Sequence, residues 1–336
     1  MDRHLKILAG ARPNQCFGDM CVPNYPRHAN RATFFGKTEF GRKLEWGFFE
    51  FFNTIRPMQT SPHPGTKFDR KLDVDRPMQK ISEITRGRVV KPAQLSDSER
   101  NVLSQQLYSV HQKIFAGVSA EEFHRHVIEP PAETTAIQLY CAADQSVIGY
   151  CAVHRYRRQV HGRNAIVLRA EAGLMPECRG RGATYGFGIV RALIEKLSHP
   201  YTPVYYLGTL VHTSSYHLFC KYFPRVYPHP DIEMPNGIRE IALQLIESFP
   251  DPAVLPADPF VRNVGWVTIE TPQEKHLNQQ TDPPDVQFFK LRNPGFSRGH
   301  GLVLLIPITW RNLTGALFSR LCERTLIALG RHKPQL

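Results

Sequence analysis

A turn rich in glycine and arginine joins an apolar run to an amphipathic segment within residues 166–197. The turn contains Arg179, Gly180, Arg181 and Gly182. Glycine lets the backbone turn tightly and approach a ligand closely, and the first amides of a following helix have no partners within that helix. The helix dipole adds about half a positive charge at this end, and the two arginines add their own charges. The pattern therefore predicts a site for phosphate or pyrophosphate.

Two well-known phosphate-binding patterns do not describe this turn. The chain has no Gly-x-x-x-x-Gly-Lys-Ser/Thr, and Gly-x-Gly-x-x-Gly occurs only in shifted, incomplete form. The segment instead resembles the acyl-CoA loop of the GNAT superfamily of N-acyltransferases, whose pattern is Gln/Arg-x-x-Gly-x-Gly/Ala after the fourth strand. Arg179 and Gly182 match this pattern, and Thr184 departs from its last position. An ordinary surface turn is the alternative interpretation, because glycine and arginine are common in such turns.

A second segment downstream resembles motif B of the same family. Residues 204–211 form a strand-like run, and residues 214–222 have the spacing of a helix. The family usually has an asparagine at the strand end, where this chain has His212, and a tyrosine general acid on the helix, where it has Phe219. The order of elements resembles the family, while these two site positions depart from it.

The resemblance implies a GNAT-like α/β (α+β) fold with a mixed, mostly antiparallel twisted sheet flanked by helices. Upstream patterns agree with this order: Ser119 and Glu122 form a capping box that opens a helix through Val127. The other upstream elements that we expect are strands at 88–92, 135–142, 147–156 and 165–174 and a helix at 97–115. The GNAT-like acyl-CoA-binding core then covers residues 83–224.

The core has an extension on each side. Residues 1–82 are basic and rich in proline and aromatic residues, and we interpret them as a partly ordered extension. Residues 225–336 contain expected helices at 238–249 and 313–329 and strands at 265–270 and 301–308, which complete or cover the core. The segment between the two strands is expected to form a substrate lid.

Membrane contact has two candidate surfaces. An aromatic cluster within residues 44–55 fits either an amphipathic anchor for an anionic membrane or partner, or a helix packed on the catalytic domain. The C-terminal helix and its end carry Arg311, Arg320, Arg324 and Arg331, and this segment fits either peripheral membrane contact or a cover for the sheet.

Composition favours a globular, cytoplasmic protein. The chain has 336 residues, of which 42% are hydrophobic, and no apolar run long enough to cross a bilayer. Seven scattered cysteines do not form the framework of a secreted domain. The net charge of +12 is the only feature that favours nucleic acid, since no binding motif accompanies it. Histidine spacings do not predict a metal site.

The catalytic candidates follow from the needs of acyl transfer to an amine, which requires a base, a polarised thioester carbonyl and a stabilised thiolate. Glu171 is the candidate base, since it lies in the strand before the loop and apolar neighbours would raise its pKa towards neutrality. Alternatively it faces outwards and pairs with an arginine such as Arg169. Tyr216 is a candidate replacement for the tyrosine missing at Phe219, with core packing as its alternative. His212, at the strand end, is the third candidate.

The resemblance also implies how a donor binds. Pantetheine would lie along the end of the strand, and the loop would hold the pyrophosphate. The implied cofactor-binding residues are Leu174, Met175, Arg179, Gly180, Arg181, Gly182, Ala183 and Thr184.

The predicted function is a GNAT-type acyltransferase that moves an acyl group, acetyl by default, directly from CoA to an amine acceptor. Acetyl-CoA or another acyl-CoA is the co-substrate, and no metal is expected. One alternative is a long-chain acyltransferase that uses acyl carrier protein or acyl-CoA. Another is a catalytically impaired GNAT domain that acts as a binding or interaction module, as the residues at positions 184 and 219 indicate.

The loop assignment gives a first prediction. Gly182→Glu places bulk and a negative charge against the pyrophosphate, so we expect the variant to lose CoA binding in a calorimetric titration. Unchanged binding would remove the loop from the donor site.

Overall fold

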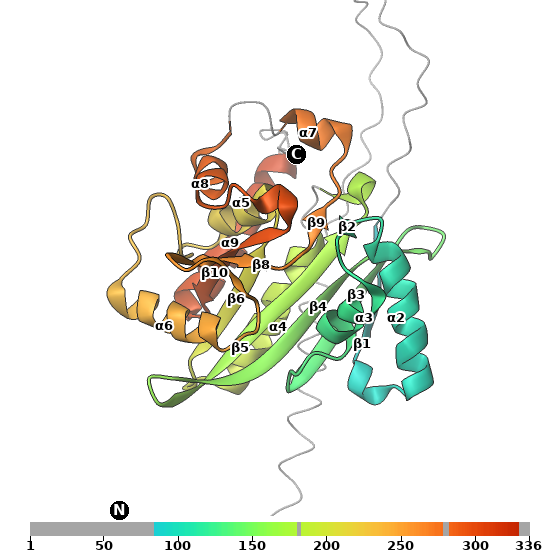
Figure 1. Ribbon diagram of the computed structural model, residues 1–336, viewed down its shortest axis with the longest axis horizontal. Coiled ribbons are helices and arrows are strands. Elements are labelled where there is room, and N and C mark those ends of the chain that lie inside the picture. The colour runs from blue at the N-terminus through green and yellow to red at the C-terminus, as the bar shows by residue number, and fades with distance from the viewer. Residues whose placement is uncertain (1–83, 180–182, 278–281, 329–336) are drawn as a thin grey trace, which may run out of the picture. The chain divides into compact units, whose positions relative to one another are not determined.

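The computed structural model describes residues 84–179, 183–277 and 282–328 (Figure 1). The predicted extension at 1–82 lies outside these ranges, and so do Gly180, Arg181 and Gly182 of the predicted phosphate loop. In the described ranges, a large sheet carries helices against both of its faces.

The large sheet has eight strands in the order β1-β3-β4-β5-β6-β10-β8-β7. Neighbouring strands within it are antiparallel except for β5 and β6, which are parallel. The predicted mixed, mostly antiparallel sheet is therefore confirmed. The strands are β1 (Thr85–Val90), β3 (Thr134–Cys141), β4 (Val147–Val160), β5 (Arg163–Leu174), β6 (Val204–Leu210), β7 (Ala253–Leu255), β8 (Asp258–Asn263) and β10 (His300–Pro307).

Helices flank this sheet at both ends (Figure 1). Helices α2 and α3 lie by β1, β3 and β4, whereas α5, α8 and α9 gather by β6 and β10. The α-helices are α2 (Asp97–His111), α3 (Ala120–Phe123), α4 (Ala183–Ser198), α5 (Thr213–Tyr222), α6 (Asn236–Glu247), α7 (Pro272–Leu277), α8 (Pro284–Arg292) and α9 (Trp310–Ala328).

Local signals explain where the first helices begin. Ser96 caps α2 and forms a capping box with Glu99, and Ser119 does the same for α3 with Glu122. The predicted capping box at Ser119 is thus confirmed. The expected helix through Val127 changes character after α3, because the segment His124–Ile128 is a π-helix.

Strand β4 is buried on both faces and connects two cores. Tyr150 and Ala152 pack in the core beneath α2, whereas Cys151 and Val153 pack in the larger core that includes α4. Alternate residues of a strand point to opposite faces. Burial on both faces accounts for the nearly continuous apolar run of this strand.

The C-terminal part departs from the sequence prediction in one respect. Strand β10 confirms the strand expected at 301–308 and lies between β6 and β8 in the sheet. The strand expected at 265–270 is wrong in extent: only β9 (Val267–Thr268) forms, and it pairs with β2 (Phe115–Ala116) in a separate two-stranded sheet. The large sheet is completed instead by β7 and β8, which the sequence analysis missed.

Helix α9 confirms the helix expected at 313–329. Its Arg320 turns inwards and contacts Tyr222 and Glu323, so this arginine is not available to a membrane surface as the sequence prediction supposed. Phe318 and Leu321 are exposed on the same helix. Of the helices in the described ranges, none combines the length and the apolar character needed to cross a membrane.

The close approach of β4 and β5 gives a stability prediction. A Cβ at Gly149 would lie 2.4 Å from the carbonyl oxygen of Gly173, which is backbone that cannot move aside. We expect Gly149→Ala to lower the free energy of unfolding by about 1–3 kcal/mol in urea denaturation. Gly188→Ala is the control, since a Cβ there meets open space in α4; it is expected to gain up to about 1 kcal/mol. Equal stabilities of the two variants would contradict the argument.

Candidate active site

The parallel strands β5 and β6 separate along their length. They pair at Ile166 with Val204, at Val167 with Tyr205 and at Leu168 with Tyr206. Beyond these pairs both strands continue, to Leu174 and Leu210, without pairing to each other. The second half of β5 therefore presents an edge towards β6 on which no strand of the described residues lies.

A cavity of about 1390 Å³ occupies this opening and extends between the helices. Its walls come from β5, β6, the start of α4, one face of α5 and the segment before α7. The lining residues that bear on the chemistry are Arg169, Glu171, Leu174, Arg179, Ala183, Thr184, Tyr206, Gly208, Thr209, His212, Ser214 and Phe219.

Glu171 lines the cavity and rests on a buried histidine. Its Oε2 lies 2.6 Å from Nε2 of His154, a residue of β4 that is fully buried. The other ring nitrogen of His154, Nδ1, forms a hydrogen bond with the hydroxyl of Thr135 at 2.9 Å. The arrangement fixes the carboxylate from behind and leaves its other side towards the cavity. The alternative that Glu171 pairs with Arg169 is not what the structure shows.

The pKa of Glu171 differs from the sequence expectation. Burial by itself raises the pKa, but the neighbouring His154 outweighs it, together with Arg169 and His126, so that the pKa lies below its ordinary value. The prediction that apolar neighbours raise this pKa towards neutrality is therefore wrong. At neutral pH Glu171 is a carboxylate, which attracts a cation.

The charge of Glu171 in turn affects buried groups near it. Burial, and next the charge of Glu171, raise the pKa of Cys151 to about 12. The same two causes raise the pKa of Tyr206 well above its ordinary value, although Arg169 opposes them. Both groups are therefore neutral at physiological pH and can donate a proton or a hydrogen bond.

Arg169 supports the outer part of the opening. Its guanidinium donates to Asp251 at 2.7 Å and lies over the ring of Phe249 at 4.5 Å. It also donates to the hydroxyl of Thr209 on β6 at 3.4 Å. Arg169 thus bridges the two separated strands, and the carboxylate of Asp251 compensates its charge.

His212 lies farther along the opening than Glu171. It follows the end of β6, whereas Glu171 lies within β5. The two side chains have separate partners, His154 for Glu171 and Glu270 for His212. Among the described residues no hydrogen bond or ion pair joins Glu171 to His212.

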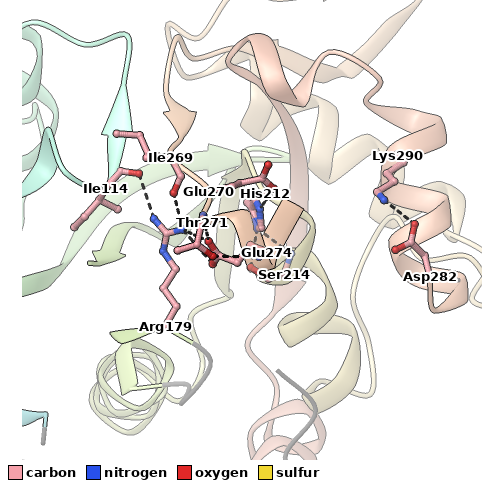
Figure 2. Close-up of polar contacts among 10 residues, drawn as sticks. All are labelled: Ile114, Arg179, His212, Ser214, Ile269, Glu270, Thr271, Glu274, Asp282 and Lys290. Atoms are coloured by element: carbon pink, nitrogen blue, oxygen red, sulfur yellow. Dashed lines mark hydrogen bonds and ion pairs between the residues drawn. The ribbon is translucent and has the colours of Figure 1, made fainter. Parts of the chain in front are cut away.

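His212 has two polar partners of its own (Figure 2). Its Nε2 lies 2.9 Å from Oε1 of Glu270, and its Nδ1 lies 2.8 Å from Oγ of Ser214. Since Nδ1 also accepts from the backbone N–H of Ser214, it caps α5. Nε2 is then the nitrogen that carries the proton towards Glu270. Glu270 is a residue that sequence reasoning missed, because 58 positions separate it from His212.

Arg179 makes more contacts with the chain than the sequence predicts (Figure 2). Its guanidinium donates to the carbonyl oxygens of Leu174, Ile269 and Ile114 and to the carboxylate of Glu274. These contacts tie the end of β5 to both strands of the small sheet. The side chain serves the structure around the opening, and a pyrophosphate would compete with Glu274 for it.

The remaining predicted residues divide into two groups. Leu174, Ala183 and Thr184 line the cavity near the start of α4. Met175 is partly buried, and its backbone N–H donates to Ile148 at 2.9 Å. Tyr216 is fully buried and does not line the cavity, since its hydroxyl donates to the carbonyl of Pro228 at 2.9 Å. This is the packing role that the sequence analysis kept as its alternative.

A metal centre has no support in the described ranges, where no three His, Cys, Asp or Glu side chains come together as a ligand set.

Comparison with known proteins finds similarity only among solved structures. No family model matches the chain, and no curated protein does. A probable N-acyltransferase from Enterococcus faecalis is 14% identical, with a TM-score of 0.29, and the match covers 44% of this chain and 38% of that one. An acetyltransferase from Trypanosoma brucei is 14% identical, with a TM-score of 0.27 and coverage of 46% and 98%.

A GNAT family acetyltransferase from Staphylococcus aureus is 15% identical, with a TM-score of 0.22, and the match covers 36% of this chain and 82% of that one. The structural neighbours are thus acetyltransferases and N-acyltransferases, the class that the sequence motifs resemble. The likeness concerns half of this chain or less.

The His154–Glu171 contact gives a prediction about charge. His154→Leu removes the partner that lowers the pKa of Glu171, so burial dominates and the pKa rises above its ordinary value. We expect a loss of about 3–5 kcal/mol in unfolding free energy at neutral pH, because the carboxylate stays buried without its partner. The loss should shrink as the pH falls through the raised pKa, where the carboxyl is protonated.

Carbon-13 NMR of the glutamate carboxyl groups and urea denaturation at two pH values measure these effects. The control is the double variant His154→Leu with Glu171→Gln, in which no charge is left and most of the stability should return. A pKa of Glu171 that does not move in His154→Leu would contradict the assigned cause.

Proposed function

We propose that this protein is a GNAT-type acyltransferase that moves an acyl group, acetyl by default, directly from CoA to an amine. The observation that carries the proposal is the opening between β5 and β6, which leaves a strand edge beside a carboxylate. The pairing of the strands ends at Leu168 and Tyr206, and the cavity begins where it ends.

The free edge of β5 suits the pantetheine arm of CoA. An extended chain with two amides can pair with exposed backbone N–H and C=O groups as an added strand does. Leu174 lies on this edge, and Ala183 and Thr184 follow at the start of α4. The unpaired amides of a helix start suit a diphosphate, so we assign the diphosphate to the start of α4.

Glu171 is the group that receives the amine. Its carboxylate is charged at neutral pH, because His154 lowers its pKa. It therefore attracts an ammonium group and accepts a proton as the nitrogen attacks the thioester carbonyl. A carboxylate with a low pKa is a weak base, so the rate should rise with pH as the free amine becomes more abundant.

His212 belongs to the donor channel in this proposal rather than to the reacting centre. Its partners are Ser214 and Glu270, whereas Glu171 contacts His154, so the two candidates belong to separate polar clusters. Its ring joins the start of α5 to Glu270, and so it shapes the wall against which pantetheine would lie.

The volume of the cavity also bears on the two alternatives. A cavity of about 1390 Å³ with apolar residues of α4 and α5 in its wall has room for more than an acetyl group, which favours keeping the long-chain donor as a second candidate. If the protein is instead a catalytically impaired domain used for binding, we expect it to bind the donor without turnover.

Titration and turnover together test the proposal. Calorimetric titration with CoA, acetyl-CoA and a long-chain acyl-CoA ranks the donors, and an amine screen measures transfer with the best one. We expect Glu171→Gln to bind the donor as the native protein does while kcat falls about 10²–10⁴-fold.

The outcomes separate the candidate functions. Donor binding with no transfer to any amine would support the binding module. If no CoA ester binds, acyl carrier protein becomes the favoured acyl donor. An unchanged kcat in Glu171→Gln would remove this residue from the reaction.

A further inference from the structure

The reaction proposed above needs a hydrogen-bond donor for the departing thiolate, and this inference rests on that proposed function. Phe219 is one of the residues of α5 that line the cavity, and it carries no hydroxyl. Phe219 is stacked on Tyr206 of β6, with the two ring centres 5.2 Å apart and the planes inclined by 29°. A tyrosine thus lies beside the place where a donor is missing.

The ring of Tyr206 lies along its own strand over Gly208. A Cβ at position 208 would lie 2.8 Å from the Tyr206 hydroxyl and 2.8 Å from its Cε1. The ring therefore extends towards the end of β6, with its hydroxyl above Gly208. The absence of a side chain at Gly208 is what allows this position.

The position of the hydroxyl coincides with the start of the opening. Tyr206 pairs with Leu168, the last pair between β5 and β6. Continuing that register places Gly208 level with Ala170, next to Glu171. Tyr206, Gly208, Ala170 and Glu171 all line the cavity. By strand alternation Ala170 and Gly208 share the face of Tyr206, whereas Glu171 projects from the opposite face. The hydroxyl and the carboxylate therefore flank the opening from its two sides, and a thioester and an amine could meet between them.

The three fully buried tyrosines have hydrogen-bond partners for their hydroxyls, whereas the buried hydroxyl of Tyr185 has none among the described residues. Tyr140 donates to Ala183, Tyr216 donates to Pro228, and Tyr150 shares a hydrogen bond with His111. In the described ranges no protein group forms a hydrogen bond with the hydroxyl of Tyr206. This hydroxyl is free to serve a ligand in the cavity.

We propose that Tyr206 is a catalytic residue that donates a hydrogen bond to the sulfur of the leaving CoA. The amine nitrogen forms a bond to the carbonyl carbon, and the C–S bond breaks with its electron pair going to sulfur. The proton of the nitrogen passes to Glu171, and the hydrogen bond from Tyr206 stabilises the thiolate until it takes a proton from solvent. Glu171 then releases its proton to solvent, so that thioester and amine become amide and thiol.

The electrostatics agree with this role. Burial and the charge of Glu171 raise the pKa of Tyr206, so it carries its proton over the whole physiological range. A donor of this kind stabilises negative charge as it develops on sulfur.

The deciding experiment compares two donors that differ in their leaving group. Acetyl-CoA releases an alkyl thiolate, a strong base that needs stabilisation, whereas phenyl thioacetate releases thiophenolate, a weaker base that leaves without it. We expect Tyr206→Phe to lower kcat with acetyl-CoA by about 10²-fold or more and to leave the rate with phenyl thioacetate near that of the native protein. The variant keeps the ring, so the stack on Phe219 and the affinity for CoA should persist in calorimetry.

Two further variants serve as controls. Tyr205→Phe removes the neighbouring hydroxyl, which belongs to a residue outside the cavity lining, and should match the native protein with both donors. Gly208→Ala retains the Tyr206 hydroxyl but displaces it, so it should share the loss with acetyl-CoA. Its effect should disappear in combination with Tyr206→Phe, because both changes act on one group.

The outcomes distinguish this inference from the proposed function. If the native protein transfers no acyl group, the proposed function fails and the role of Tyr206 falls with it. If the native protein is active and Tyr206→Phe loses nothing, or loses equally with both donors, the proposed function stands and Tyr206 does not assist the departure of sulfur.

Discussion

The end of hydrogen bonding between β5 and β6 is the constraint on which the rest of this structure depends. A parallel pair inside a mostly antiparallel sheet is held only at Ile166, Val167 and Leu168, and each strand is secured on its other side, β5 by β4 and β6 by β10. The sheet therefore remains continuous while its middle opens. Backbone polar groups on the opened edge need partners, and an extended ligand with amides can supply them.

Charge inside the opening is balanced by position. Arg169 is compensated by Asp251, and the carboxylate of Glu171 by the ring of His154, which is buried behind it. Arg169 and Glu171 are two residues apart on β5 and therefore lie on the same face of the strand. Both line the cavity. An amine that enters meets a carboxylate that is held in place and charged. His154 already offsets the desolvation of this carboxylate in the folded protein, so that cost does not arise when the amine binds.

Sequence patterns identified elements whose signals are local. The capping box of Ser119 and Glu122, the buried strand β5 and strand β10 each depend on residues close together in the chain, and they were predicted. The prediction for the segment around Val267 failed because its pairing partner is Ala116, about 150 residues away, and no local pattern encodes such a choice. His154 and Glu270 were missed for the same reason, since only the fold brings them to Glu171 and His212. The pKa of Glu171 was predicted in the wrong direction because the sequence shows its apolar neighbours and not the imidazole behind them.

Arg179, a residue of the predicted loop, holds the structure around the opening together. Its guanidinium has four chain partners, in Leu174, Ile114, Ile269 and Glu274, and these come from three separate parts of the sequence. A diphosphate could take this side chain only by releasing Glu274, which also accepts from the N–H of Thr271 at the start of α7. It is therefore the backbone amides at the start of α4 that are suited to hold phosphate, since they have no helical partners. The arginine keeps the small sheet and the segment of Glu270 beside the opening, and through Glu270 it fixes the wall formed by His212.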